Sequence, residues 1–172
     1  MPPNLRIPQD QIEFLKSLVK ANVRFVVIGG YAVRFFGCDR ETTDLDILID
    51  STEENAIRLR PLVVDYLGYE PTFVVADLLK HQKQLKTPDR MIDILTSVEG
   101  LEFGTAYQCR EQYYVDGVLV PFVSKDHLIF IKEAAIAADA TRGELELGDI
   151  ECLKSKHPHN KSLQRSATRG AR

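Results

Sequence analysis

Residues 25–50 decide the fold of this 172-residue chain and read FVVIGGYAVRFFGCDRETTDLDILID. Residues 25–28 are mostly β-branched and predict a buried strand. The strand ends at Gly29 and Gly30, where the chain can turn sharply and where another group can approach the backbone without meeting a Cβ atom. Residues 31–36 predict a short helix that Gly37 closes. The first half of this stretch is therefore expected to form a strand, a glycine turn and a helix.

The second half predicts another strand, which carries aspartates on one face. Apolar side chains at positions 45, 47 and 49 alternate with Asp44 and Asp46, so both aspartates point the same way. Two carboxylates about 6 Å apart repel by roughly 3 kcal/mol at an effective dielectric near 20. A fold that keeps them together therefore shifts a pKa or binds a cation. Mg²⁺ commonly takes one or two protein carboxylates, with water and phosphate oxygens as its other ligands.

Asp93 and the glycine pair complete the group of residues that could carry chemistry. Asp93 lies in an apolar run, where an ionised side chain is costly unless it is paired, hydrogen-bonded or bound to a metal ion. Gly29 and Gly30 form a strand-to-helix turn, whose backbone N–H groups can bind phosphate. Each feature alone has a structural explanation: the solvated face of an edge strand for Asp44 and Asp46, and a hydrogen-bonded strand end for Asp93. Their combination favours a site for a divalent cation and a phosphate.

The rest of the chain alternates between helical and strand patterns, which predicts an α/β (α+β) fold that ends in a pair of helices. Gly68 is a suitable C-terminal stop for one helix, and Asp116-Gly117 suits a two-residue hairpin turn. The predicted helices span residues 12–19, 31–36, 53–67, 76–85, 124–140 and 144–153. The predicted strands span residues 25–28, 43–50, 72–75 and 90–96, with a hairpin over residues 113–120.

Charge and cysteine content indicate the class of protein. The net charge of −3 divides into +6 over residues 154–172, which contain no Asp or Glu, and −9 over residues 1–153. We expect one domain over residues 1–153 and a basic, disordered tail over residues 154–172. Cys38, Cys109 and Cys152 are an odd set without a C-x-x-C pair, which predicts core or surface thiols in a reducing cytoplasm. No apolar run approaches the roughly 18 residues of a membrane span, so no membrane partner is expected.

The spacing of these motifs resembles the nucleotidyltransferase superfamily that includes DNA polymerase β. In that superfamily a hydrophobic residue, Gly, and Gly or Ser precede Asp-x-Asp by a spacer similar to the 13 residues between Gly30 and Asp44. Within it, the sequence is most similar to small bacterial proteins related to abortive-infection toxins and to minimal nucleotidyltransferases. The resemblance spans about residues 10–153. It rests on residues 27–33, Gly37, Arg40, Thr42, residues 44–47 and 90–96, Gly100, Phe103, residues 116–118 and 120–122, Leu128, Ile129 and Lys132.

The resemblance implies a mixed sheet flanked by helices and a metal-dependent reaction. An acceptor hydroxyl or phosphate would attack the α-phosphorus of a nucleoside triphosphate, and pyrophosphate would leave. Asp44, Asp46 and Asp93 would be the catalytic residues and the ligands of Mg²⁺ or Mn²⁺. The remaining implied roles are nucleotide binding by Gly29, Gly30, Arg40, Thr42 and Lys132. Each cation also has a structural alternative to nucleotide binding. Arg40 could form a surface ion pair with Asp39 or Glu41, and Lys132 could occupy a solvated helix position.

One departure from the family pattern bears on activity. Relatives follow the lysine that corresponds to Lys132 with Gly-Arg-x-Lys-Asp, whereas this chain has an alanine-rich segment in which only Arg142 and Asp149 are partial matches. Two function classes therefore stay open. The first is an enzyme that modifies an RNA such as tRNA, a protein or a small molecule, and that could be the toxin of a toxin–antitoxin pair. The second is a catalytically weakened binding or regulatory module with an acidic cleft.

Overall fold

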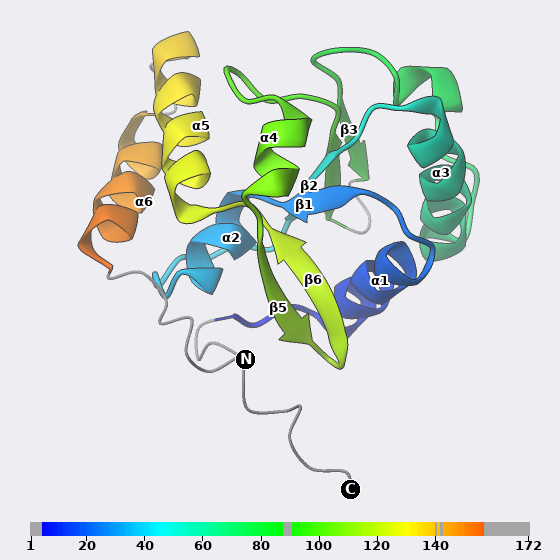
Figure 1. The fold of residues 1–172 in the computed structure, drawn as a ribbon, viewed down its shortest axis with the longest axis horizontal. Helices are drawn as coiled ribbons and strands as arrows, with labels where there is room; N and C mark the ends of the chain where they lie inside the picture. The colour runs from blue at the N-terminus through cyan, green and yellow to red at the C-terminus, as the bar shows by residue number, and fades with distance from the viewer. Residues whose placement is uncertain (1–4, 88–90, 140, 142, 157–172) are drawn as a thin grey trace, which may run out of the picture.

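A six-stranded mixed sheet forms the centre of the molecule in the computed structural model, which describes residues 5–87, 91–139, 141 and 143–156 (Figure 1). The strand order is β3-β4-β2-β1-β6-β5. β1 is antiparallel to β2 and parallel to β6, and β2 is parallel to β4. Both edge strands are antiparallel to their neighbours. The strands are β1 (Phe25–Val27), β2 (Leu45–Ile49), β3 (Gln84–Thr87), β4 (Ile92–Leu95), β5 (Glu111–Val115) and β6 (Val118–Phe122).

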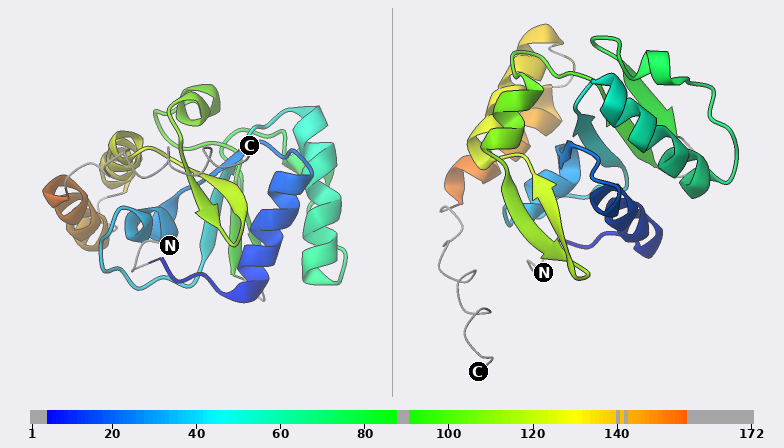
Figure 2. Two further views of the ribbon diagram at one scale, coloured as in Figure 1. Left: turned by 60° about the horizontal axis from the view of Figure 1, so that its bottom comes forward. Right: turned by 45° about the vertical axis from the view of Figure 1, so that its right-hand side comes forward.

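Helices lie on both sides of the sheet. α1 and α3 pack together on one side, whereas α2, α5 and α6 lie on the other (Figures 1 and 2). The helices are α1 (Gln9–Lys20), α2 (Gly29–Phe35), α3 (Glu53–Leu67), α4 (Phe103–Gln108), α5 (Lys125–Ala138) and α6 (Gly143–Ser155), with a 3₁₀ turn η1 (Val75–Asp77). This arrangement buries both faces of β1 and β2, which explains why their sequences are almost continuously apolar.

Local sequence signals set several of the element ends. The hydroxyls of Thr52 and Ser124 accept hydrogen bonds from backbone N–H groups in the first turns of α3 and α5. Gly68 ends α3 with a φ of +76°. Asp116 and Gly117 both have positive φ, as the two-residue turn between β5 and β6 requires. The predicted hairpin and the predicted helices at 12–19, 31–36, 53–67, 124–140 and 144–153 are thus present, with ends that differ by a few residues.

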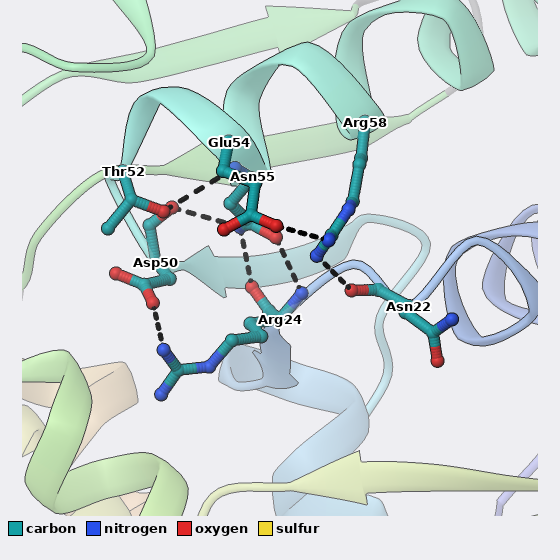
Figure 3. Close-up of polar contacts among 7 residues, drawn as sticks. All are labelled: Asn22, Arg24, Asp50, Thr52, Glu54, Asn55 and Arg58. Atoms are coloured by element: carbon teal, nitrogen blue, oxygen red, sulfur yellow. Dashed lines mark hydrogen bonds and ion pairs between the residues drawn. The ribbon is translucent and has the colours of Figure 1, made fainter.

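A buried asparagine fixes the end of the β1–β2 pair that lies away from Asp44 and Asp46. The Asn55 side-chain oxygen accepts from Arg24 N at 2.7 Å, and its NH₂ group donates to Arg24 O and Asp50 O, each at 2.9 Å (Figure 3). Arg24 also forms an ion pair with the Asp50 carboxylate at 2.5 Å. Asn55 therefore anchors the first turn of α3 to both central strands.

Two predicted elements are wrong. The strand expected at residues 72–75 and the helix expected at residues 76–85 are replaced by η1, turns and β3. β3 is a polar edge strand in which only Thr87 is buried, so it carries no apolar pattern and pairs with β4 alone. The short helix α4 was not predicted.

Two of the three cysteines form a disulfide, which corrects the expectation of three thiols. Cys38 and Cys152 are 114 residues apart in sequence, and their Cα atoms are 6.0 Å apart. Cys109 is an exposed thiol, as predicted. The bond removes cysteine usage as an argument for a reducing compartment.

The predicted tail begins at residue 154, and its residues from 157 onward lie outside the described part of the chain. The division of the chain at residue 153 therefore stays a prediction. Over the residues with described positions, each helix is too short or too polar to cross a bilayer.

Candidate active site

Asp46 and Asp93 lie side by side on neighbouring strands. β2 and β4 are parallel, and their register pairs Asp46 directly with Asp93, so the two side chains leave the sheet on the same face. Asp93 is almost completely buried. Asp44 lies just before β2, is exposed, and accepts a hydrogen bond from Thr43 Oγ1 at 3.2 Å. The structure therefore brings two of the three predicted carboxylates into register and places the third at the adjacent strand entry.

The Asp46 carboxyl group carries the strongest electrostatic perturbation in the site. Burial, and after it the negative charges of Asp93 and Asp44, raise the pKa of Asp46 to about 7. Lys132 and Lys86 act in the opposite direction but do not restore the ordinary value of 3.8. The site thus concentrates negative charge that the protein's own cations do not neutralise, and a bound cation would stabilise the ionised form.

Asp93 has two partners on the edge strand that the sequence did not predict. Gln84 Nε2 donates to Asp93 Oδ2 at 2.6 Å, and Lys86 Nζ lies 3.6 Å from the same oxygen. Both side chains come from β3, which overlaps the end of the helix expected at residues 76–85. The alternation of Gln84 and Lys86 along a strand would have revealed them only once β3 was known to pair with β4.

The glycine turn packs directly against Asp46. Gly29 has a φ of +63°, and a Cβ atom there would lie 2.0 Å from Asp46 Oδ2. A Cβ atom on Gly30 would lie 2.3 Å from Thr42 Oγ1. The turn therefore needs glycine for its backbone conformation and for its close approach to the carboxylate. Gly29 therefore lies against Asp46, and Gly30 lies against the Thr42 side chain.

The two predicted nucleotide-binding cations converge on helix α6. Lys132 is buried on α5, and its Nζ donates to Glu146 Oε2 at 2.6 Å and to Asp149 Oδ2 at 2.8 Å. Arg40 Nε lies 3.2 Å from Asp149 Oδ1. The solvated position considered for Lys132 is therefore wrong, and the ion pair of Arg40 is with Asp149. Glu146 was not predicted as a site residue, although Glu146 and Asp149 are three residues apart on one helix face.

A pocket of about 330 Å³ lies between Asp46 and Lys132, and Asp93 is not among its lining residues. Asp46, Gly29 and Gln84 line it from the sheet side, and Lys132 and Glu146 from the helices. Apolar side chains from β4, the loop after it and α5 form much of its wall. The remaining lining residues are Ile28, Leu95, Ser97, Val98, Glu99, Leu128, Ile131, Ala135, Ala138 and Asp139.

Gln11 of α1 ties the entries of the two aspartate-bearing strands together. It is buried, and its Nε2 donates to Thr43 O at 2.9 Å and to Met91 O at 3.2 Å. These carbonyls directly precede Asp44 and β4. No sequence signal marks Gln11, because it is one polar residue on the buried face of an amphipathic helix.

The carboxylates fit a divalent cation held by few protein ligands. Within the described part of the chain, no group of three or more His, Cys, Asp or Glu side chains is arranged as a complete metal site. Two adjacent carboxylates with an excess of negative charge are nevertheless the donor set that Mg²⁺ uses when substrate phosphates complete its shell.

Comparisons with known proteins give solved structures only. No protein-family model matches the sequence, and no curated protein matches it. The structure of ANT(2")-Ia in complex with adenylyl-2"-tobramycin is similar with a TM-score of 0.57 and 16% identity, covering 83% of this chain and 87% of that chain. The solution structure of the antibiotic-resistance factor ANT(2")-Ia has a TM-score of 0.55, also at 16% identity, with 83% and 82% covered. An antigenic nucleotidyltransferase-like protein from Paracoccidioides brasiliensis has a TM-score of 0.54 and 15% identity, with 86% and 77% covered.

Proposed function

Since this chain has the nucleotidyltransferase fold, we propose that it transfers a nucleoside monophosphate from a nucleoside triphosphate to an acceptor hydroxyl. The observation that carries the proposal is the in-register pair Asp46 and Asp93 beside the Gly29 turn, where Asp46, Gly29 and Lys132 line one pocket. Fold alone does not assign an activity, but this constellation supplies the groups that the reaction needs.

The carboxylate side of the pocket would activate the acceptor. Asp46 and Asp93, with Asp44 at the strand entry, would hold Mg²⁺ or Mn²⁺, which supplies positive charge to the triphosphate and lowers the pKa of the acceptor hydroxyl. Asp93 would accept the hydroxyl proton, and Gln84 holds its Oδ2 in place. The acceptor oxygen then bonds to the α-phosphorus, the bond from that phosphorus to the bridging oxygen breaks, and pyrophosphate leaves.

The phosphate side of the pocket combines backbone and cation. Gly29 and Gly30, at the start of α2, would present backbone N–H groups to the β- and γ-phosphates. Lys132 would contribute a charge held in a fixed position by its two carboxylate partners. Arg40 and Thr42 would act at the edge of this site, since Arg40 is bound to Asp149 and Thr42 packs against Gly30.

We propose a small-molecule acceptor ahead of RNA or protein. One structural neighbour, ANT(2")-Ia, is in complex with an adenylylated small molecule, adenylyl-2"-tobramycin. In this chain the pocket is limited to about 330 Å³ and includes Glu99 and Asp139 at its wall. Carboxylates at the wall would favour an acceptor that carries amino groups. A role as a toxin with an antitoxin partner would instead require an RNA or protein acceptor.

A second candidate function, a regulatory module that binds nucleotide without transferring it, is favoured by one observation. Lys132 and Arg40 are already paired with Glu146 and Asp149, so their charge toward a triphosphate is reduced. Such a module would bind Mg²⁺ and nucleotide but would form no product.

A labelling experiment tests these alternatives. Purified protein is incubated with each α-³²P-labelled nucleoside triphosphate, Mg²⁺ or Mn²⁺, and in parallel with lysate RNA, lysate protein and a panel of amino-sugar and polyamine alcohols. We expect label on a small molecule, loss of label with Asp46→Asn or Asp93→Asn, and retained label with Asp65→Asn, an exposed control on α3. Label on RNA or protein would contradict a small-molecule acceptor and would support the alternative of a toxin that modifies a macromolecule. Nucleotide binding without any labelled product would support the regulatory module, and absence of both would refute the proposed function.

A further inference from the structure

The Cys38–Cys152 disulfide connects two parts of the candidate site that are far apart in sequence. Cys38 lies in the connection between α2 and β2, which has neither helix nor strand from residue 38 to residue 44. This connection carries Arg40, Thr42 and Asp44. Cys152 lies in α6, which is otherwise packed mainly against α5.

On the α6 side, the bond holds the helix that fixes Lys132. Glu146 and Asp149 are on the same helix as Cys152, and both accept hydrogen bonds from Lys132 Nζ. Ile150 and Leu153 bury apolar side chains, but the contacts between α6 and the sheet are few. The disulfide is therefore the covalent restraint on the position of the Lys132 partners.

On the loop side, the bond restrains the segment that leads into the aspartates. Thr42 packs against Gly30, Gln11 binds the carbonyl of Thr43, and Asp44 follows directly. Arg40, in the same segment, forms an ion pair with Asp149 on α6. One bond thus restrains both the carboxylate side and the cation side of the pocket, and such restraint preorganises a binding site.

A small reductant can reach the disulfide from the Cys152 side. Both cysteines line a pocket of about 790 Å³ on the surface between the loop and α6, where Cys152 is half-buried and Cys38 is almost completely buried. Four carboxylates line this pocket. Glu146 and Asp149 are paired with Lys132 and Arg40, so the excess negative charge comes from Asp39 and Glu144. Their charge should repel an anionic thiol such as glutathione and admit a neutral dithiol more readily.

We propose that Cys38 and Cys152 are a thiol–disulfide regulatory site, at which oxidation assembles the nucleotide pocket and reduction by a small neutral dithiol loosens it. This inference rests on the proposed function, because the regulated property is nucleotide binding. In the reducing step a thiolate of the dithiol attacks one cysteine sulfur, and the other cysteine leaves as a thiolate. The second thiol of the reductant then displaces the first cysteine, so that two electrons and two protons pass to the protein and the dithiol becomes a cyclic disulfide.

The test compares nucleotide binding in the two redox states of the full chain. Binding of the four α,β-non-hydrolysable nucleoside triphosphates with Mg²⁺ is measured by calorimetry, before and after reduction with dithiothreitol. Reduction should weaken binding by about tenfold, which lies within the usual range of coupling between two sites. The Cys38→Ser/Cys152→Ser variant should bind as reduced wild type does and ignore dithiothreitol, whereas Cys109→Ser should respond as wild type does.

Two further readouts do not depend on catalysis. By reciprocity, saturating nucleotide with Mg²⁺ should shift the disulfide equilibrium in a dithiothreitol redox buffer by the same factor toward the oxidised form. Hydrogen exchange should accelerate over residues 38–44 and over α6 on reduction, with β5 and β6 unchanged as an internal control. Glutathione should reduce the bond more slowly than dithiothreitol at equal thiolate concentration.

The outcomes separate this inference from the proposed function. Equal nucleotide affinity in both redox states, or tighter binding after reduction, would overturn the regulatory site and leave the proposed function intact. Absence of nucleotide binding in both states would overturn both.

Discussion

Replacing Asp46 with asparagine should make the metal-free protein more stable, while it should abolish the proposed nucleotidyl transfer. In the structure, burial and the neighbouring Asp93 and Asp44 charges raise the pKa of Asp46 from 3.8 to about 7. The folded protein therefore keeps a proton on Asp46 over a pH range in which the unfolded chain has lost it. An asparagine side chain at this position would have no charge to bury, so Asp46→Asn should remove the resulting dependence of stability on pH.

The size of the effect follows from the two pKa values. Each pKa unit corresponds to about 1.4 kcal/mol, so the difference between 3.8 and about 7 amounts to about 4 kcal/mol at most. Because the folded-state pKa is the higher one, wild type has its full stability below about pH 4. It loses up to this amount as the pH rises through about 7. The advantage of Asp46→Asn over wild type should grow across that range and level off above pH 7.

Urea unfolding in EDTA at several pH values between 4 and 8 measures this directly, with Asp65→Asn as the exposed control. Adding Mg²⁺ at pH 8 should then stabilise the wild type more than Asp46→Asn, because a ligand that binds only the folded state raises its stability. Wild type and Asp46→Asn curves that stay parallel over the whole pH range would refute the reasoning.

The other predictions concern the parts of the fold that support the site, and urea unfolding tests each of them. Gly29→Ala should cost more than about 2 kcal/mol, because the positive φ disfavours alanine and the new Cβ would overlap the Asp46 carboxylate. Gly104→Ala is its control, since a Cβ there meets no atom within 4 Å, and a comparable loss in that variant would contradict the steric argument. Lys132→Met should cost about 3 to 5 kcal/mol by leaving two carboxylates buried without their cation, and wild-type stability would contradict this. Asn55→Ala should cost about 2 kcal/mol because three backbone groups lose their partner, and an unchanged urea midpoint would contradict this.

Most of the architecture could be predicted because its signals are local. The apolar run before Gly29, the alternation around Asp46 and the Asp116-Gly117 turn each depend on contacts within a few residues. β3 could not be predicted in this way, because a polar edge strand is stabilised by its pairing with β4 and not by its own pattern. The helix predicted at residues 76–85 is wrong for the same reason, because a local pattern does not reveal the pairing of β3 with β4.

The candidate site divides along similar lines. Asp44, Asp46 and Asp93 stand out in the sequence because charged residues beside apolar strands need an explanation. Gln84, Glu146 and Gln11 do not stand out, since each is an ordinary polar residue until the fold places it against the site.

The sequence by itself determined a strand, a glycine turn and an aspartate-bearing strand, together with the mixed α/β class. Only the tertiary structure decided that Asp46 faces Asp93, that Lys132 is bound by α6, and that Cys38 is bonded to Cys152. The physical reason is that helix and turn signals arise from neighbours in the chain, whereas strand register, ion pairs and disulfides depend on packing between segments many tens of residues apart.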